Sequence, residues 1–215
     1  MPAILPGDTD IYAITDGRLS LGRPLAVVAQ NLLNAGVRIL QYREKKLKAG
    51  KMLEECRMLR HMTRETGACF IVNDHIDIAL LVEADGVHIG QEDLHVAEVR
   101  RLVGAKMLIG LSTHDPAQAR AAQAAGADYI GVGPLFATKT KEDVVAPVGY
   151  DYLDWVMENM NMPFVAIGGI KERNIAEVAR HGARCCALIS ELLGASDIAA
   201  KVAAVRKAMV RCLQV

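Results

Sequence analysis

The sequence predicts an α/β protein of the (β/α)8, or TIM-barrel, class, in which eight parallel strands alternate with eight helices. Three observations lead to this prediction. Eight short apolar runs are each followed by a longer segment with helical periodicity. The runs are apolar almost throughout, as in a parallel sheet that helices cover on both faces. The length of 215 residues suits a closed barrel that folds as one unit.

Strands are expected at eight runs rich in apolar and β-branched residues: 11–15, 37–42, 69–73, 86–89, 107–111, 129–133, 164–168 and 185–190. Helical periodicity covers eight further segments: 23–36, 50–67, 77–84, 95–104, 115–126, 150–160, 171–182 and 198–210. Several of these helices end in a glycine before the next strand, as a left-handed C-cap requires: Gly36, Gly67, Gly104, Gly126 and Gly182. Asp115 before Pro116 predicts an N-cap and a first-turn proline. An open doubly wound sheet is the main alternative, but no GxGxxG follows the first strand, and eight units favour closure.

The bulk composition predicts one cytoplasmic domain. No linker divides the chain, so residues 1–215 are expected to form a single domain, with the core barrel at about 11–211. The 25 basic and 25 acidic residues cancel, which argues against nucleic acid or a membrane surface as partner. The first ten residues lack a signal-peptide pattern, and no uncharged apolar run approaches the ~18 residues of a membrane span. Five cysteines without CxxC spacing indicate reduced thiols. The sequence does not show the oligomeric state, and a homodimer stays open.

Polar residues gather where the predicted strands end, while the opposite rim carries mostly helix caps. The active site of a (β/α)8 barrel lies at the C-terminal ends of its strands, so this asymmetry is the first indication of function. The segment 131–149 after the sixth strand contains Thr-Lys-Thr-Lys and far exceeds the usual length of about 4–6 residues. It is expected to be either disordered or a lid that holds a ligand.

The segment QYREK (41–45) follows the second strand. If Gln41, Arg43 and Lys45 alternate along an extended chain, their side chains point the same way. A guanidinium fork beside an ammonium group suits phosphate oxygens. A solvated basic turn is the alternative interpretation, and this segment alone does not decide between them.

Two carboxylates, Asp74 and Asp93, follow the third and fourth strands, which are neighbours about 4.8 Å apart in the expected sheet. Such a pair facing a phosphate site is a common Mg²⁺ site, because this ion keeps several waters and bridges to diphosphate oxygens. Asp74 could instead cap the helix that follows it. Together with Arg43 and Lys45, metal binding is the preferred interpretation.

A second anion site is expected after strands seven and eight. Gly168 and Gly169 open a helix, and barrels of this class often bind phosphate there through backbone N–H groups. No residue has the setting of a strong base or nucleophile. Most histidines lie on surface patterns and are expected to be solvated: His61, His75, His95 and His181. His88 is expected to be a hydrogen-bonded barrel residue rather than a ligand, and His114 stays open.

The chain resembles the thiamine phosphate synthase family in eight segments that follow that family's order and approximate spacing: IYAITD (11–16), QYREK (41–45), IVND (71–74), ADGVHIGQED (84–93), IGLSTH (109–114), ADYIGVGPLFATKTK (127–141), FVAIGGI (164–170) and LIS (188–190). GQED with ND, and GPLFATKTK, are the most specific of these segments, whereas AIGGI is shared by many phosphate-binding barrels. The resemblance covers nearly the whole chain.

The resemblance implies a transferase. It would couple 4-amino-2-methyl-5-(diphosphooxymethyl)pyrimidine with a thiazole phosphate, giving thiamine phosphate and pyrophosphate. The implied mechanism is a dissociative substitution with one Mg²⁺ per site, in which the diphosphate leaves before the thiazole nitrogen captures the pyrimidine cation. Such a reaction needs leaving-group electrostatics and positioning rather than a base.

Carried over residue by residue, the resemblance assigns most of the polar strand ends. The pyrimidine diphosphate would be held by Gln41, Arg43, Lys45, Asn73, Ser112 and Lys141. Asp74 and Asp93 would hold Mg²⁺, and the thiazole phosphate would meet Thr138, Thr140, Gly169, Ile189 and Ser190. The expected substrate-binding set also includes Tyr42, Glu44 and Lys139, the last at a position where family members often have proline. Of all these, the residues expected to be catalytic are Arg43, Lys45, Ser112 and Lys141.

Three other functions compete with this one. A related thiazole tautomerase would use the same barrel without diphosphate or metal, but it carries a histidine near the position of Pro134 and lacks Thr-x-Thr-Lys. A sugar-phosphate epimerase would share only the phosphate site after strands seven and eight, and would need an acid–base pair that the sequence does not supply. A non-catalytic regulatory binder is the fourth possibility, which an activity assay decides.

Overall fold

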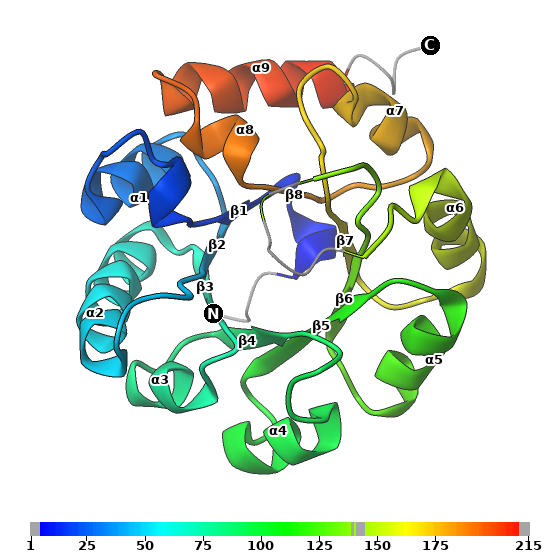
Figure 1. Cartoon of the computed structure of the whole chain (residues 1–215), viewed down its shortest axis with the longest axis horizontal. Coiled ribbons are helices and arrows are strands. Elements are labelled where there is room, and N and C mark those ends of the chain that lie inside the picture. Colours follow the sequence, from blue (N-terminus) through cyan, green and yellow to red (C-terminus); the bar gives the residue numbers. More distant parts are fainter. Residues whose placement is uncertain (1–4, 139, 141–144, 211–215) are drawn as a thin grey trace.

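Eight parallel strands close into a barrel in the order β1 to β8 in the computed structural model, which describes residues 5–138, 140 and 145–210 (Figure 1). The strands are β1 (Ile11–Ile14), β2 (Ile39–Tyr42), β3 (Cys69–Asn73), β4 (Gly86–Ile89), β5 (Leu108–Thr113), β6 (Tyr129–Val132), β7 (Phe164–Ala166) and β8 (Cys186–Leu188). Pairing of Ile11 on β1 with Cys186 on β8 completes the ring. The predicted single-domain (β/α)8 barrel is therefore confirmed.

Helices surround the strands in one outer layer (Figure 1). They are α1 (Leu25–Asn34), α2 (Ala49–Thr66), α3 (Ile76–Leu81), α4 (Val96–Val103), α5 (Pro116–Ala124), α6 (Gly149–Asn159), α7 (Ile175–Arg180), α8 (Ser190–Leu193) and α9 (Ile198–Val210). Short 3-10 turns cover Pro6–Asp8, before β1, and Gly17–Leu19, after it. The turn after β1 and the short helix α8 were not predicted.

Most ends of helices and strands were predicted correctly from local sequence signals, with three exceptions. Gly67 ends α2 in the left-handed conformation (φ 68°), and Asp115 accepts the Gln118 N–H at the start of α5, both as predicted. The expected strand 185–190 is shorter, because Ser190 already begins α8. Helix α3 stops early, since Glu83 adopts a φ of 52°. Helix α7 starts late, because the Asn174 side chain accepts the Lys171 N–H and forms a turn before it.

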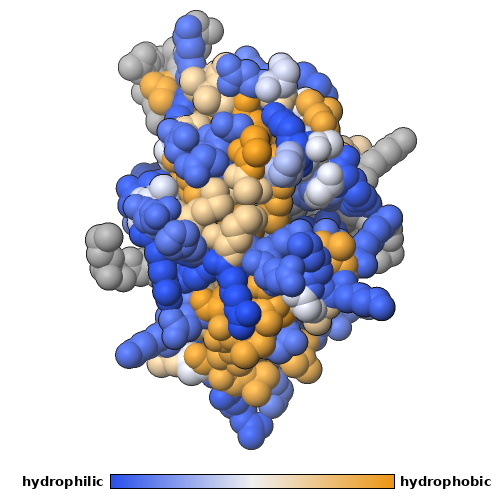
Figure 2. Space-filling model, turned by 90° about the vertical axis from the view of Figure 1, so that its left-hand side faces the viewer, coloured by the Kyte–Doolittle hydropathy of each residue, from blue (hydrophilic) through white to orange (hydrophobic). Residues whose placement is uncertain are grey.

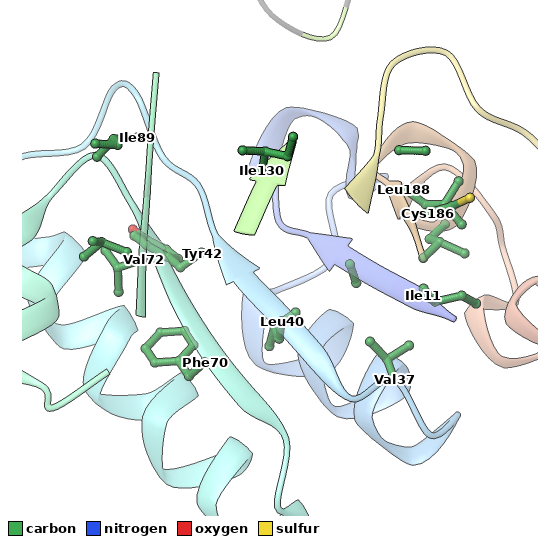
Figure 3. Packing of buried hydrophobic residues seen from close by; sticks show 14 of the residues in the cluster. Ile11, Val37, Leu40, Tyr42, Phe70, Val72, Ile89, Ile130, Cys186 and Leu188 are labelled. Atoms are coloured by element: carbon green, nitrogen blue, oxygen red, sulfur yellow. The ribbon is translucent and has the colours of Figure 1, made fainter. Parts of the chain in front are cut away.

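The apolar core has two layers. The larger layer lies between the strands and the helices, where Phe70, Val72, Leu40 and Tyr42 pack together (Figure 3). The smaller layer fills the barrel interior and contains Tyr12, Ile14, Ile39, Cys69, Ile71, Tyr129, Val165, Cys185 and Ala187. The interior is thus packed with side chains, which leaves the C-terminal mouth of the barrel as the place for a site.

The outer surface is mixed in character. On the face shown in Figure 2, hydrophilic residues are spread widely and orange apolar patches lie between them. Large apolar side chains that are well exposed include Leu21, Leu81, Leu94 and Leu102. None of the helices in the described part of the chain is both long and apolar enough to cross a membrane.

Candidate active site

Strand β2 delivers alternating side chains to opposite faces of the barrel wall. Gln41 points inward and its Nε2 donates to the Tyr12 hydroxyl at 2.8 Å. Tyr42 points outward into the helix layer, where its hydroxyl donates to Glu55 of α2 at 2.7 Å (Figure 3). The structure therefore does not bring Tyr42 to the barrel mouth, and we leave it out of the proposed site. The cause is the two-residue side-chain period of a strand.

Arg43 follows β2 and is buried at the mouth, with only 7% of its side chain exposed. Its Nη1 lies 3.4 Å from the Asp16 carboxylate, while its Nε makes no hydrogen bond within the described residues. A buried guanidinium with an unused donor favours an anionic ligand, because leaving such a donor unpaired is costly. This geometry supports an anion site and argues against the solvated basic turn.

Asp16, just after β1, holds two arginines. Arg18 donates to both oxygens of its carboxylate, at 3.1 and 2.9 Å, and Arg43 approaches the same group. Burial would raise the pKa of Asp16, but hydrogen bonds from the Arg18 side chain and backbone, and the charges of both arginines, lower it below its ordinary value. Asp16 therefore stays ionised and fixes the Arg43 guanidinium in place.

Asp16→Asn is expected to lower the free energy of unfolding by about 1–3 kcal/mol at pH 7, because two arginines lose a charged acceptor. A carboxyl whose pKa falls on folding adds stability above its unfolded pKa of about 3.9 and loses it as pH drops through the folded pKa. The difference between the two proteins should therefore shrink below about pH 4. Urea unfolding at pH 7 and pH 3 measures it. An equal difference at both pH values would contradict the assigned role of the charge.

Asp74 lies at the end of β3 in a conformation rare for a residue with a side chain, with a φ of 59°. Its N–H donates to the His88 carbonyl of the neighbouring β4, and Lys45 Nζ lies 2.5 Å from its Oδ2. Asp74 is not the cap of α3, because His75 occupies that position and makes no side-chain cap bond. The interpretation of Asp74 as a helix cap is therefore wrong. Its carboxylate instead faces the ammonium group of Lys45, which follows β2.

Asp93 lies in the exposed turn that follows β4. Its Oδ2 accepts the Gly90 N–H at 2.7 Å, which keeps the carboxylate next to the end of the strand. Strands β3 and β4 are paired, with Asn73 opposite His88, as predicted for the strands that precede the two aspartates. Within the described ranges, no three His, Cys, Asp or Glu side chains form a metal cluster. Two carboxylates at adjacent strand ends fit Mg²⁺, which usually takes one or two carboxylates and completes its shell with water and phosphate.

Glu44, Asn73 and Ser112 were predicted at the ends of β2, β3 and β5, and each has defined surroundings in the structure. The Glu44 carboxylate accepts the backbone N–H groups of Lys45 and Lys46 at 2.7 and 2.6 Å. Glu44 therefore shapes the turn that presents Lys45. Asn73 is buried at the end of β3, and Ser112 Oγ lies 3.0 Å from His88 Nε2.

The loop after β6 docks on the turn after β7. The Leu135 N–H donates to the Ile167 carbonyl and the Phe136 N–H to the Gly168 carbonyl, at 2.9 and 3.0 Å. A Cβ on Gly168 would lie 2.4 Å from Pro134, and Gly168 has a φ of 98°. Only glycine meets both demands. Gly168 is therefore a packing requirement, and Gly169 lies under the same loop, since a Cβ there would be 2.8 Å from Phe136.

The predicted threonines meet at the tip of this loop. Thr138 Oγ1 lies 3.2 Å from Thr140 Oγ1, and Arg18 donates to the Thr140 carbonyl at 3.0 Å. Arg18 thus links Asp16 to the threonine pair. The predicted residues Lys139 and Lys141 lie outside the described residues. Ile189 and Ser190 form the turn into α8, next to the ends of β7 and β8 as predicted.

Comparison with known proteins decides the family. A family model described as thiamine monophosphate synthase matches residues 11–192. The chain belongs to this family. It is 60% identical to the thiamine-phosphate synthase of Pelotomaculum thermopropionicum over 93% of this chain and 91% of that protein. It is 56% identical to the thiamine-phosphate synthase of Lawsonia intracellularis over 97% and 98% of the two chains. A solved thiamine phosphate pyrophosphorylase from Pyrococcus furiosus is 34% identical, with a TM-score of 0.87 and coverage of 97% and 98%.

In this member of the thiamine monophosphate synthase family, two kinds of side chain behave as the sequence predicted. His88 is hydrogen-bonded through both ring nitrogens, to Tyr129 and Ser112. Burial raises the pKa of the Cys56 and Cys186 thiols to about 12, so these cysteines are poor nucleophiles. His181 differs from the prediction, because it is half-buried, stacks on Tyr150 with ring centroids 4.1 Å apart, and bonds Asp154.

Three further residues support the candidate site and were not predicted as part of it: Asp16, Arg18 and His114. Asp16 was visible as a polar strand end, but its partner Arg18 lies in a turn with no motif. His114 was left open, and the structure shows its Nδ1 2.6 Å from the Gly133 carbonyl, so it anchors the loop after β6. Each of these residues acts on another side chain or on the backbone, and such contacts leave no local pattern.

Proposed function

We propose that this protein is a thiamine-phosphate synthase, a transferase that joins 4-amino-2-methyl-5-(diphosphooxymethyl)pyrimidine to a thiazole phosphate. The observation that carries the proposal is the buried Arg43 guanidinium with its unused Nε, next to Lys45 and Asp74 at the barrel mouth. Cations placed there suit the diphosphate of the first substrate. Curated relatives at 60% and 56% identity carry the same function in their names.

The carboxylates of Asp74 and Asp93 would hold one Mg²⁺ per site. Hard oxygen ligands on two neighbouring strand ends suit this ion, which supplies positive charge to a departing diphosphate. Lys45, which pairs with Asp74 in this structure, would shift its ammonium group towards the diphosphate oxygens when the ion occupies the carboxylate.

The bond chemistry follows from these charges. The C–O bond between the pyrimidine methylene and the diphosphate breaks, and its electron pair leaves on the diphosphate oxygen. Arg43, Lys45, Ser112 and Lys141 would stabilise that oxygen and its neighbours. The thiazole nitrogen then donates its lone pair to the methylene carbon and forms the C–N bond. No proton is transferred in either step, which fits a site that we build without a general base.

The thiazole phosphate would bind between the loops after β6, β7 and β8. Thr138 and Thr140 would donate their hydroxyls, and the backbone at Gly169, Ile189 and Ser190 would donate N–H groups. The docking of residues 135–136 on 167–168 supports this arrangement, because it brings the threonine loop to the glycine turn. Gln41 and Asn73 would contact the pyrimidine, and Glu44 would keep its part in the turn.

The tautomerase alternative is not favoured. A tautomerase has no need of the paired carboxylates or of the buried Arg43, since its substrate carries no diphosphate.

Two further proposals concern the compartment and the partners of the enzyme. The described residues include four buried cysteines that form no disulfide, which suits a reducing compartment, so we propose a cytoplasmic enzyme. Its partners would be small phosphorylated molecules rather than nucleic acid or membrane, with a homodimer as the expected assembly if it associates at all.

The proposal is tested by mixing both phosphorylated substrates with Mg²⁺ and measuring thiamine phosphate. We expect product in the complete mixture and none after EDTA treatment, with activity restored by excess Mg²⁺. Zinc-free buffers serve as the control for a contaminating metal. Turnover that survives chelation would remove the metal assignment, and an inactive complete mixture would remove the function.

A further inference from the structure

A chain of hydrogen bonds crosses the barrel interior and joins five strands. Gln41 Nε2 donates to the Tyr12 hydroxyl at 2.8 Å, and the Tyr12 and Tyr129 hydroxyls lie 2.9 Å apart. The Tyr129 hydroxyl lies 3.1 Å from His88 Nδ1, and His88 Nε2 lies 3.0 Å from Ser112 Oγ. The chain therefore connects two side chains of the barrel mouth, Gln41 on β2 and Ser112 on β5, through groups buried below them.

The barrel is built around this chain. Tyr12 and Tyr129 are each 1% exposed, and their rings lie 6.2 Å apart between centroids. The ring of His88 lies 5.5 Å from that of Tyr129. Gly110 provides the necessary space, since a Cβ there would lie 2.1 Å from the Tyr129 ring and 2.5 Å from His88 Nδ1. A glycine on β5 thus makes room for a polar pair inside an otherwise apolar core.

With a neutral His88, two proton arrangements run in one direction from Tyr12 to Ser112, because each neutral phenol has one hydrogen to donate. In the first, Gln41 donates to Tyr12, Tyr12 to Tyr129, and Tyr129 to His88 Nδ1. His88 then carries its proton on Nε2 and donates it to Ser112, whose own hydroxyl proton stays free. In the second, the bonds from Tyr12 to Ser112 are reversed while Gln41 Nε2 still donates to Tyr12, and Ser112 donates its proton to His88 Nε2.

Burial raises the pKa of Tyr12 and Tyr129 above the ordinary phenol value, so both hydroxyls keep their protons and each can donate one hydrogen bond. The choice between the two directions comes from the ligand. A diphosphate offers only acceptor oxygens, so a serine that meets it has to donate. Ser112 can donate only if His88 does not take its proton.

We propose that Tyr129 is a positioning residue that holds His88 with its proton on Nε2 and thereby turns the Ser112 hydroxyl proton towards the substrate. The identity of the substrate, and with it the choice of direction, rests on the proposed function, whereas the contacts themselves do not. Tyr129 is the essential member, because its hydroxyl is the group within hydrogen-bond distance of His88 Nδ1 in this chain of contacts. Tyr12 acts on the other end, where it fixes the Gln41 amide.

The direction is measured by ¹⁵N NMR of the imidazole rings in the ligand-free protein, with His88 assigned by comparison with His88→Gln. We expect the proton on Nε2 in the wild type and in Tyr12→Phe. In Tyr129→Phe the donor to Nδ1 is lost, so the second tautomer becomes populated. A wild-type spectrum with the proton on Nδ1 overturns the proposal, and so does a Tyr129→Phe spectrum that equals the wild type.

Kinetics provide the second measurement. Tyr129→Phe should lower kcat/KM for the pyrimidine diphosphate about tenfold, the size expected for one misdirected hydrogen bond, and leave KM for the thiazole phosphate unchanged. Tyr152→Phe is the matched control, because it removes a buried phenol that donates to Thr113 at 2.7 Å outside this chain. Equal losses in the two variants would overturn the proposal.

The two proposals fail in different ways. A wild-type protein that carries the Nε2 proton but couples no substrates contradicts the function and leaves the direction of the chain intact. An active wild type with the Nδ1 proton contradicts the positioning role alone. If Tyr129→Phe does not fold, the wild-type spectrum still decides the direction.

Discussion

Arg43→Lys is expected to lower kcat/KM for the pyrimidine diphosphate by about a hundredfold, the scale on which one preorganised charge-stabilising group acts. The lysine keeps the positive charge but replaces a rigid fork with a single ammonium group. It can still pair with Asp16, 3.4 Å from the present Nη1, but its single nitrogen cannot also place a donor where the unpartnered Nε lies. Steady-state kinetics with the pyrimidine substrate varied measure the loss.

Arg38→Lys is the matched control for this change. Arg38 is exposed just before the opposite end of the same strand, β2, away from the barrel mouth. Its replacement should leave kcat/KM within about twofold of the wild type, as is usual for a surface substitution. If Arg43→Lys also stays within that range, the guanidinium geometry is not part of the site.

Asp93→Ala should abolish most of the coupling activity, by roughly 10²–10³-fold at low Mg²⁺, because metal-assisted charge stabilisation contributes several kcal/mol. The fold should survive, since the carboxylate is exposed and its bond to the Gly90 N–H is confined to one turn. The expected signature is a higher Mg²⁺ concentration at half-maximal rate. A Mg²⁺ titration of the initial rate, with a thermal melt of the same sample, measures both.

Glu98→Ala is the matched control for the loss of an acidic group. Glu98 is exposed on α4 and pairs only with Arg101 among the contacts described for it. Its removal should leave the Mg²⁺ dependence unchanged. An Asp93→Ala protein with the Mg²⁺ profile of the wild type would remove Asp93 from the metal site, whatever its rate.

The barrel could be predicted from the sequence because each strand and most helices show a local sequence pattern. Apolar runs alternate with helical periodicity, and glycines such as Gly67 end the helices in the required conformation. Helix α8 was missed because four residues, Ser190–Leu193, are too few to show a period. The ends of α3 and α7 were missed because single residues, Glu83 and Asn174, override the apolar pattern.

The candidate site was predictable only where residues follow a strand directly. Arg43, Asp74 and Asp93 were predicted in this way and stay proposed site residues, whereas Tyr42 points into the helix layer because sequence neighbours on a strand point to opposite faces. The hydrogen bonds inside the barrel could not be predicted from the sequence, because Tyr12 and Tyr129 lie 117 positions apart and meet only when the barrel closes. The hydrogen bond from Arg18 to the Thr140 carbonyl is of the same kind, because these two residues lie 122 positions apart.

The central claim is that the barrel mouth releases a diphosphate while it forms a carbon–nitrogen bond. Its most direct measurement is pyrophosphate release with both substrates present and with each substrate left out. The account predicts one pyrophosphate for each thiamine phosphate formed, and neither product when either substrate is missing. Conversion of the thiazole phosphate alone, or thiamine phosphate without pyrophosphate, would contradict it.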